Sequence, residues 1–262
     1  MSDILSLTQY WNGRLHVWEK PALRAIYTLG VDTGQGRGKD RSVIQVLRKG
    51  DAQRPDTQVA TYACDALSPR EFAVVVASLG RYYHGEDDEA LAVVERNSAG
   101  GGDLTLEELR FRHSYGHLYA QKNLDSATGI WQTNLGWFTG GTSRPKLILA
   151  FREAVCGGFI QLNCPNLRQE MEVFEGDVAL ANARAKAGEH DDRVMAMALA
   201  YWGAHESDWL SGEDAPRVRT TDPLTVAEQP TDTTEKPRAD FQNTAATTAD
   251  YNEYAEAWNP FS

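Results

Sequence analysis

Short apolar runs separated by polar turns fill the first quarter of the chain. Tyr27–Val31 and Gln58–Cys64 are rich in apolar residues, and Ser42–Arg48 alternates apolar and polar positions as a half-buried strand does. The turns between them, 34–38 and 49–56, contain glycine, proline and charged residues. Runs of this length joined by short polar turns predict three strands of an antiparallel meander.

A helix and a buried strand are expected next. Ser68-Pro69-Arg70-Glu71 contains an N-cap, a proline at the first helical position and a capping-box glutamate, so a helix should run from here to about Tyr83. Ala90–Val94 is apolar throughout, which is typical of a parallel strand buried on both faces, and it ends in Glu95.

The remaining pattern predicts shorter elements. The expected helices are 104–111, 142–155, 165–174 and 190–202; the expected strands are 117–120, 129–133 and 159–162; a hairpin is possible in 175–188. Three antiparallel strands followed by parallel strands with crossover helices is the arrangement of a ribonuclease H-like fold. The sequence therefore predicts an α/β protein with a mixed sheet flanked by helices.

The composition divides the chain into three parts. Residues 1–25 should form an extended lead-in whose Trp11 and Trp18 pack on the domain, and residues 26–210 should form that domain. Residues 211–262 are rich in Thr, Asp, Glu, Ala and Pro and predict a disordered, acidic tail. Its terminal aromatic residues suggest either a solvated end or a small docking segment.

Bulk composition is that of a soluble globular protein. Apolar residues make up 42% and charged residues 24% of the 262 positions. No apolar run is nearly as long as the about 20 residues needed to span a bilayer. The N-terminal sequence does not have the pattern of a secretory signal. The three cysteines, Cys64, Cys156 and Cys164, cannot all pair and suit a reducing interior.

The net charge of −11 argues against simple nucleic-acid binding. Residues 211–262 hold ten acidic and four basic residues, a net of −6, which leaves −5 for residues 1–210. Bound divalent cations would offset part of the negative charge at a site. The acidic balance is therefore compatible with a metal-dependent nuclease.

Four carboxylates follow the pattern of a metal site. Asp32 and Glu95 each end an apolar strand, and Asp191 and Asp192 lie at the start of the last predicted helix. If the strands are neighbours, these carboxylates meet at one sheet edge, and they stay ionised together only beside positive charge. Oxygen ligands favour Mg²⁺ or Mn²⁺. Two such ions about 3.5–4 Å apart would support phosphodiester hydrolysis.

In this interpretation Asp32 would bridge the two ions, Glu95 would hold one, and Asp191 and Asp192 would hold one or both. His190 would assist or orient its neighbours. Each signal has a structural alternative, because an aspartate after a strand is often a turn residue and acidic residues favour helix N-termini. The order and neighbours of the four residues give the pattern its specificity.

These motifs resemble the nuclease domain of the large terminase subunit of tailed phages. The resemblance covers roughly residues 8–203 and rests on the segments 27–36, 40–43, 94–97, 133–134, 143–146 and 188–196. It implies a ribonuclease H-like endonuclease that cuts concatemeric viral DNA, with Asp32, Glu95, Asp191 and Asp192 as metal ligands. It also implies double-stranded DNA, a packaging ATPase, a small terminase and a portal as partners, no membrane, and the host cytoplasm as the location.

The resemblance does not extend to a packaging ATPase. Gly34–Asp40 resembles a phosphate loop, but its glycine spacing departs from the Walker A motif and Asp40 stands where Ser or Thr is needed. This segment is better interpreted as a turn between two strands. An isolated domain, a split-gene product or a truncated prophage copy would each fit, and motor activity is not expected of this chain alone.

Basic residues near these motifs are candidates for phosphate contacts. They are Arg37, Lys39 and Arg41 in the first turn and Arg144 and Lys146 at a helix start; a solvated face is the alternative for each. His113 and His117 lack a third zinc ligand. Three other functions stay open: a Holliday-junction resolvase, a sugar-kinase or actin-like nucleotide-binding protein, which would need a second phosphate loop that is absent, and a non-catalytic binding module.

Overall fold

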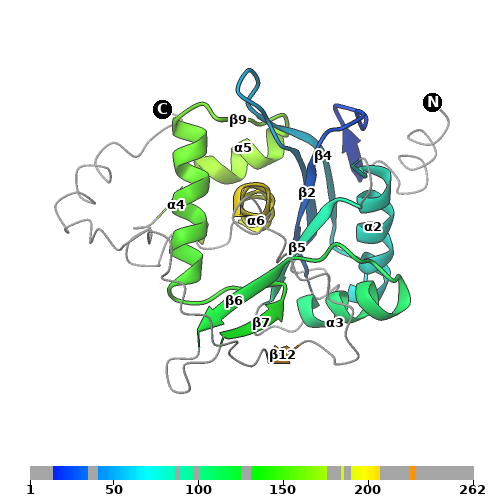
Figure 1. Ribbon diagram of the computed structural model, residues 1–262. Helices are drawn as coiled ribbons and strands as arrows, with labels where there is room; N and C mark the ends of the chain where they lie inside the picture. The colour runs from blue at the N-terminus through cyan, green and yellow to red at the C-terminus, as the bar shows by residue number, and fades with distance from the viewer. Residues whose placement is uncertain are drawn as a thin grey trace, which may run out of the picture.

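The computed structural model describes residues 14–34, 41–85, 89–96, 101–124, 131–175, 184–185, 190–206 and 225–227. Helices cover both faces of a central mixed sheet (Figure 1). The strands follow the spatial order β1 (Leu15–Val17), β4 (Asp56–Cys64), β3 (Ser42–Arg48), β2 (Tyr27–Asp32), β5 (Leu91–Arg96) and β8 (Trp137–Phe138), with β9 (Ile160–Gln161) beside β4.

The strand directions confirm the predicted fold class. β1, β4, β3 and β2 pair antiparallel in that order, whereas β5 pairs parallel to β2 and β8 pairs parallel to β5. β2 and β3 form a hairpin on either side of the glycine-rich turn. This pairing agrees with the interpretation of that turn as a strand connection.

The helices form two layers. α2 (Pro69–Tyr82) and α3 (Gly101–Glu107), which continues as a π-helix (Glu108–Arg112), cover one face; α4 (Ser143–Cys156), α5 (Pro165–Glu172) and α6 (Asp192–Glu206) cover the other. Figure 1 shows α6 end-on, between the sheet and α4. Within the described ranges no helix has the length and apolar character needed to cross a bilayer.

α2 starts as its sequence predicts. The Ser68 side chain accepts a hydrogen bond from the backbone of Glu71, and the Glu71 carboxylate accepts one from the backbone of Ser68. These two bonds satisfy backbone donors that the helix itself leaves without partners. The helix then buries Phe72, Val76 and Leu79 against the sheet.

α6 packs so closely against β2 that the two backbones are in contact at Gly30. A Cβ atom on Gly30 of β2 would lie 1.8 Å from the carbonyl oxygen of Ala196 and 2.5 Å from the nitrogen of Ala200. Gly203, one turn further along α6, lies against Thr28 and Val93. The helix therefore runs antiparallel to β2, so its N-terminus points toward the strand end that carries Asp32.

The far end of α6 is held by a polar contact. His205 Nε2 lies 2.5 Å from Asp56 Oδ2, and the other carboxylate oxygen of Asp56 accepts a hydrogen bond of 2.7 Å from the backbone of Gly50. Asp56 is the first residue of β4 and lies at the sheet end opposite to Asp32. The C-terminal end of α6 is thus tied to the first residue of β4.

The prediction that Ser42–Arg48 is half-buried was wrong. Residues 42–47 are all buried, because helices cover both faces of the sheet at β3. The buried Gln45 accepts a hydrogen bond of 2.7 Å from Gln58. Gln58 in turn accepts bonds from the backbone of Asn163 and Cys164. The side-chain nitrogen of Gln45 has no hydrogen-bond partner among the described residues.

Several element bounds differ from expectation. β6 (Ala120–Leu124) and β7 (Trp131–Leu135) pair antiparallel and start three and two residues later than expected. α3 starts at Gly101 instead of Leu104. β10 (Phe174–Glu175) and β11 (Arg184–Ala185) pair antiparallel, as the possible hairpin requires.

The segments outside the expected domain contribute two strands. In the lead-in, Leu15 is buried in β1 while Trp18 is 37% exposed, so Leu15 is the buried contact; Trp11 lies outside the described residues. In the tail, β12 (Thr225–Ala227) pairs with β7. The rest of residues 211–262 lies outside the described ranges, so the predicted disorder of this tail stays a prediction.

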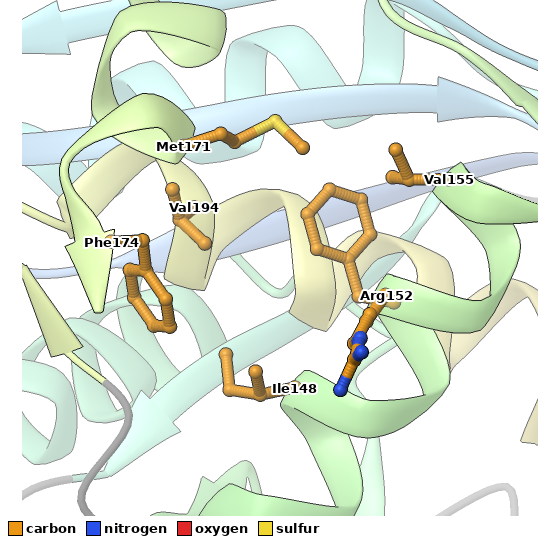
Figure 2. Close-up of a pocket in the computed structure, with 7 residues that line it drawn as sticks. Ile148, Arg152, Val155, Met171, Phe174 and Val194 are labelled. Carbon is orange, nitrogen blue, oxygen red and sulfur yellow. The ribbon is translucent and has the colours of Figure 1, made fainter. Parts of the chain in front are cut away.

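A small apolar cavity lies between α4, α5 and α6 (Figure 2). Its walls include Ile148, Val155, Met171, Phe174 and Val194, and its volume is about 20 Å³. A space of this size is close to that of one water molecule, and apart from Arg152 its walls are apolar. It is therefore a packing gap between helices.

The α6–β2 contact predicts that Gly30→Ala destabilises the protein severely. The added methyl group would force backbone apart, at a cost of about 3 kcal/mol or more. Thermal and urea unfolding would measure the loss. Gly116→Ala is the matched control, because no atom lies within 4 Å of its Cβ position; equal stability of the two variants would contradict the contact.

Candidate metal centre

Asp32 and Glu95 lie side by side at the end of two parallel strands. Val31 of β2 is in register with Val94 of β5, and each carboxylate follows directly. Asp32 is 8% exposed and Glu95 5%. The apolar runs that end in these residues therefore bring two carboxylates into the protein interior.

Asp191 and Asp192 reach the same edge from α6. Asp192 is the first helical residue, and the carbonyl of the preceding Asp191 accepts the backbone hydrogen of Met195. The antiparallel packing of α6 on β2 brings this turn to the end of β2 near Asp32. We call Asp32, Glu95, Asp191 and Asp192 the acidic cluster; the structure brings together all four residues that the sequence singled out.

The pKa of Asp32 lies well above its ordinary value. Burial is the largest cause, because it disfavours the charged carboxylate. The neighbouring Glu95 carboxyl group is the next cause, through charge repulsion and a shared hydrogen bond, and Asp192 and Asp191 add further repulsion. Asp32 is thus the buried centre on which the other three carboxylates act.

Asp192 has one oxygen without a partner. Burial, and then the charge of Glu170, raise the pKa of Asp192 to about 6, while His190 and the backbone N–H of Arg41 favour its charged form. Its Oδ2 atom is buried and accepts no hydrogen bond among the described residues; His190 Nδ1 lies 3.6 Å away. A buried oxygen of this kind is costly unless a cation or donor satisfies it.

The turn between β8 and α4 contacts two members of the acidic cluster. Thr139 donates a hydrogen bond of 2.6 Å to Glu95, and Arg144 donates one of 2.6 Å to Asp191. Ser143 fixes the turn, since its hydroxyl accepts a bond from the backbone of Gly140 and donates one to the carbonyl of Phe138.

Glu170 and Arg193 support the start of α6. The Glu170 carboxylate accepts hydrogen bonds from the backbone and the guanidinium of Arg193. Burial raises the pKa of Glu170, while the bonds from Arg193 favour its charged form. The roles of Thr139 and Glu170 were missed from the sequence, because neither lies in a local pattern that marks a site.

The residues predicted to contact DNA lie in different surroundings. Arg144 pairs with Asp191, Lys146 is exposed on α4, and Arg37 and Lys39 lie outside the described residues. Arg41 lies 3.9 Å from Glu170. Trp137 is buried and packs against Trp202 and Tyr119. His117 contacts the Glu89 carbonyl.

The acidic cluster has the chemistry of a divalent-metal site. No three Asp, Glu, His or Cys side chains in the described part of the chain already surround one metal position. Thr139 and Arg144 each bond to one carboxylate of the cluster. A bound cation would nevertheless satisfy the unpartnered Asp192 oxygen and offset the repulsion at Asp32. All the donors are carboxylate oxygens, which suit Mg²⁺ or Mn²⁺.

Solved structures share this fold. The large terminase nuclease from thermophilic phage G20c is 21% identical, with a TM-score of 0.51 over 72% of this chain and 88% of that chain. Its magnesium-bound and cobalt-bound structures each give a TM-score of 0.53 at the same identity, covering 72% of this chain and 87% of theirs. No known protein family matches the sequence. No curated protein matches it either.

The chain has the ribonuclease H-like fold of large terminase nucleases. At 21% identity the likeness concerns the fold, and the predicted fold is thereby confirmed. In this terminase nuclease fold the acidic cluster occupies the carboxyl edge of β2 and β5 together with the N-terminus of α6.

Asp32→Asn is predicted to stabilise the metal-free protein. Because folding raises the pKa of Asp32, the folded chain holds this proton more tightly than the unfolded chain. The free energy of unfolding therefore falls as pH rises from about 4 through the raised pKa, and it stays low above that value. The amide carries no charge and avoids this loss.

Melting curves at pH 4 and pH 8 test the prediction. Asp32→Asn should melt higher than the wild type at pH 8, by about 2–4 °C for each kcal/mol regained, and the two should converge at pH 4. Mn²⁺ should raise the melting temperature of the wild type alone. A variant that melts at or below the wild type at pH 8 would refute the electrostatic cost assigned to Asp32.

Thr139→Val should weaken Mn²⁺ binding about tenfold, as loss of a hydrogen bond that orients a ligand does. Valine keeps the shape of threonine but cannot donate to Glu95. Isothermal titration calorimetry gives the affinity. Thr139→Ser retains the hydroxyl and should bind like the wild type, and equal affinity of the valine variant would remove Thr139 from the site.

Proposed function

We propose that this chain is a divalent-metal-dependent DNA endonuclease that cuts concatemeric viral DNA during genome packaging. The observation that carries the proposal is the convergence of Asp32 and Glu95 with Asp191 and Asp192 at one sheet edge. The shared fold supports it, since the G20c structure of that fold is a nuclease and has been solved with magnesium bound.

The acidic cluster would hold two Mg²⁺ or Mn²⁺ ions. Asp32 would bridge them, Glu95 would bind one, and Asp191 and Asp192 would bind one or both. When bound, such ions lower the pKa of water and stabilise the charge that develops on the phosphate. Thr139 orients Glu95, and Glu170 holds the turn that carries the aspartate pair.

The burial of the cluster serves the same chemistry. Asp32 and Glu95 are almost inaccessible to water, so their charges act at low dielectric, where they bind cations strongly. Asp191 and Asp192 are more exposed, with 27% and 16% of their side chains accessible. The open side of the cluster therefore lies toward the aspartate pair, which is where a DNA phosphate would enter.

Double-stranded DNA is the proposed substrate. Arg37, Lys39, Arg144 and Lys146 are the proposed phosphate contacts, and the net charge of −11 makes the affinity for DNA alone weak and sensitive to salt. A packaging ATPase, a small terminase and a portal are the proposed partners, within the cytoplasm of an infected bacterial host. The ATPase motor would come from outside the sequence printed here.

Plasmid cleavage tests the proposal. Purified protein with Mn²⁺ or Mg²⁺ should nick and linearise supercoiled plasmid, and chelation of the metal should stop the reaction. Asp32→Asn, Glu95→Gln, Asp191→Asn and Asp192→Asn should each lower the rate about 100-fold or more, because each removes charge that holds the metal.

Asp51→Asn is the control, since this exposed carboxylate lies in the β3–β4 turn far from the cluster. It should cleave like the wild type. Cleavage that survives Asp32→Asn would refute the site. Preference for four-way junctions over linear duplex would favour a junction resolvase, and calorimetry without carboxylate-dependent metal binding would favour a non-catalytic module.

A further inference from the structure

Arg144 pairs with Asp191, one of the two more exposed members of the acidic cluster. Its Nη2 atom lies 2.6 Å from Asp191 Oδ2, and both side chains are about three-quarters buried, with exposed fractions of 22% and 27%. A guanidinium at this distance neutralises part of the cluster's charge. In the metal-free protein, one oxygen of the Asp191 carboxylate therefore pairs with the Arg144 guanidinium.

The backbone around Arg144 is fixed by hydrogen bonds, so a change of partner would involve its side chain alone. The Arg144 nitrogen donates to the carbonyl of Gly140, and the Ser143 hydroxyl is bonded within the same turn. The turn is also tied to β5 through Thr139 and Glu95. The long arginine side chain can therefore reach another partner while its backbone stays in place.

We infer that Arg144 is an exchangeable counter-ion, which neutralises Asp191 in the metal-free protein and turns to a DNA phosphate when Asp191 binds a divalent cation. If Arg144 stayed paired with Asp191, it would lie close to a doubly charged ion bound to the same carboxylate. The two positive charges would then repel each other. Arginine is well suited to the second partner, because its planar group binds phosphate through two hydrogen bonds.

The position of Arg144 favours this exchange. It lies in the first turn of α4, where the positive end of the helix dipole also attracts phosphate. Lys146 is exposed on the same turn. Arg144 would thus connect occupation of the acidic cluster to DNA binding, and this inference rests on the proposed nuclease function.

Opposite effects on metal binding and on cleavage test the exchange. Arg144→Ala should bind Mn²⁺ about three- to fivefold more tightly in calorimetry without DNA, the size expected for a lost ion-pair competitor. At saturating Mn²⁺ it should cleave plasmid about tenfold more slowly or worse, because a charged contact to phosphate is gone. Arg144→Lys keeps the charge and should retain part of the cleavage.

Arg54→Ala is the matched control. It also removes an arginine–aspartate pair, 2.7 Å from Asp51, at the opposite end of the sheet, and it should change neither measurement. Melting curves monitor folding: Arg144→Ala should lose stability without metal and gain more from Mn²⁺ than the wild type does.

The outcomes separate this inference from the proposed function. If the wild type binds Mn²⁺ and cleaves DNA but Arg144→Ala binds Mn²⁺ equally or more weakly, the exchange is refuted and the nuclease function stands. Tighter Mn²⁺ binding with unchanged cleavage would refute the transfer to DNA. Absence of Mn²⁺ binding in both proteins would overturn the inference together with the proposed function.

Discussion

A helix can approach a strand to backbone contact only where the strand offers no side chain, and Gly30 provides that place on β2. Ala196 and Ala200 fill the contact from α6, and the direction of the helix follows from it. Asp191 and Asp192 consequently lie beyond the end of β2, where Asp32 and Glu95 lie. The acidic cluster therefore depends on small residues about one turn away from it.

The cluster is stabilised by contacts and destabilised by its own charge. Asp32 is buried among like charges, while Thr139, Arg144 and Arg193 supply donors to Glu95, Asp191 and Glu170. Such a site stores unfavourable electrostatic energy that a bound cation would release. If the proposed metal binds there, stability and metal binding are linked at the same residues, as is common where function needs a strained site.

Much of the site was predictable because its signals are local. Asp32 and Glu95 end apolar runs, and the capping box marks the start of α2. The start of α3 was missed because Gly101 and Gly102 are helical for a tertiary reason: a Cβ on Gly102 would lie 1.8 Å from the Glu95 carbonyl. Thr139 reaches Glu95 across 44 residues, and no local pattern announces such a contact.

The hydrogen bond between His205 and Asp56 has a mechanical meaning. α6 has 15 residues, which makes it a rod about 22 Å long. One end carries the aspartate pair, and the other is fastened to the β3–β4 hairpin. Because a helix is stiff along its axis, a displacement of that hairpin would also displace Asp191 and Asp192. The packing of α6 on β2 and the contact between His205 and Asp56 therefore together fix the position of the aspartate pair along the sheet.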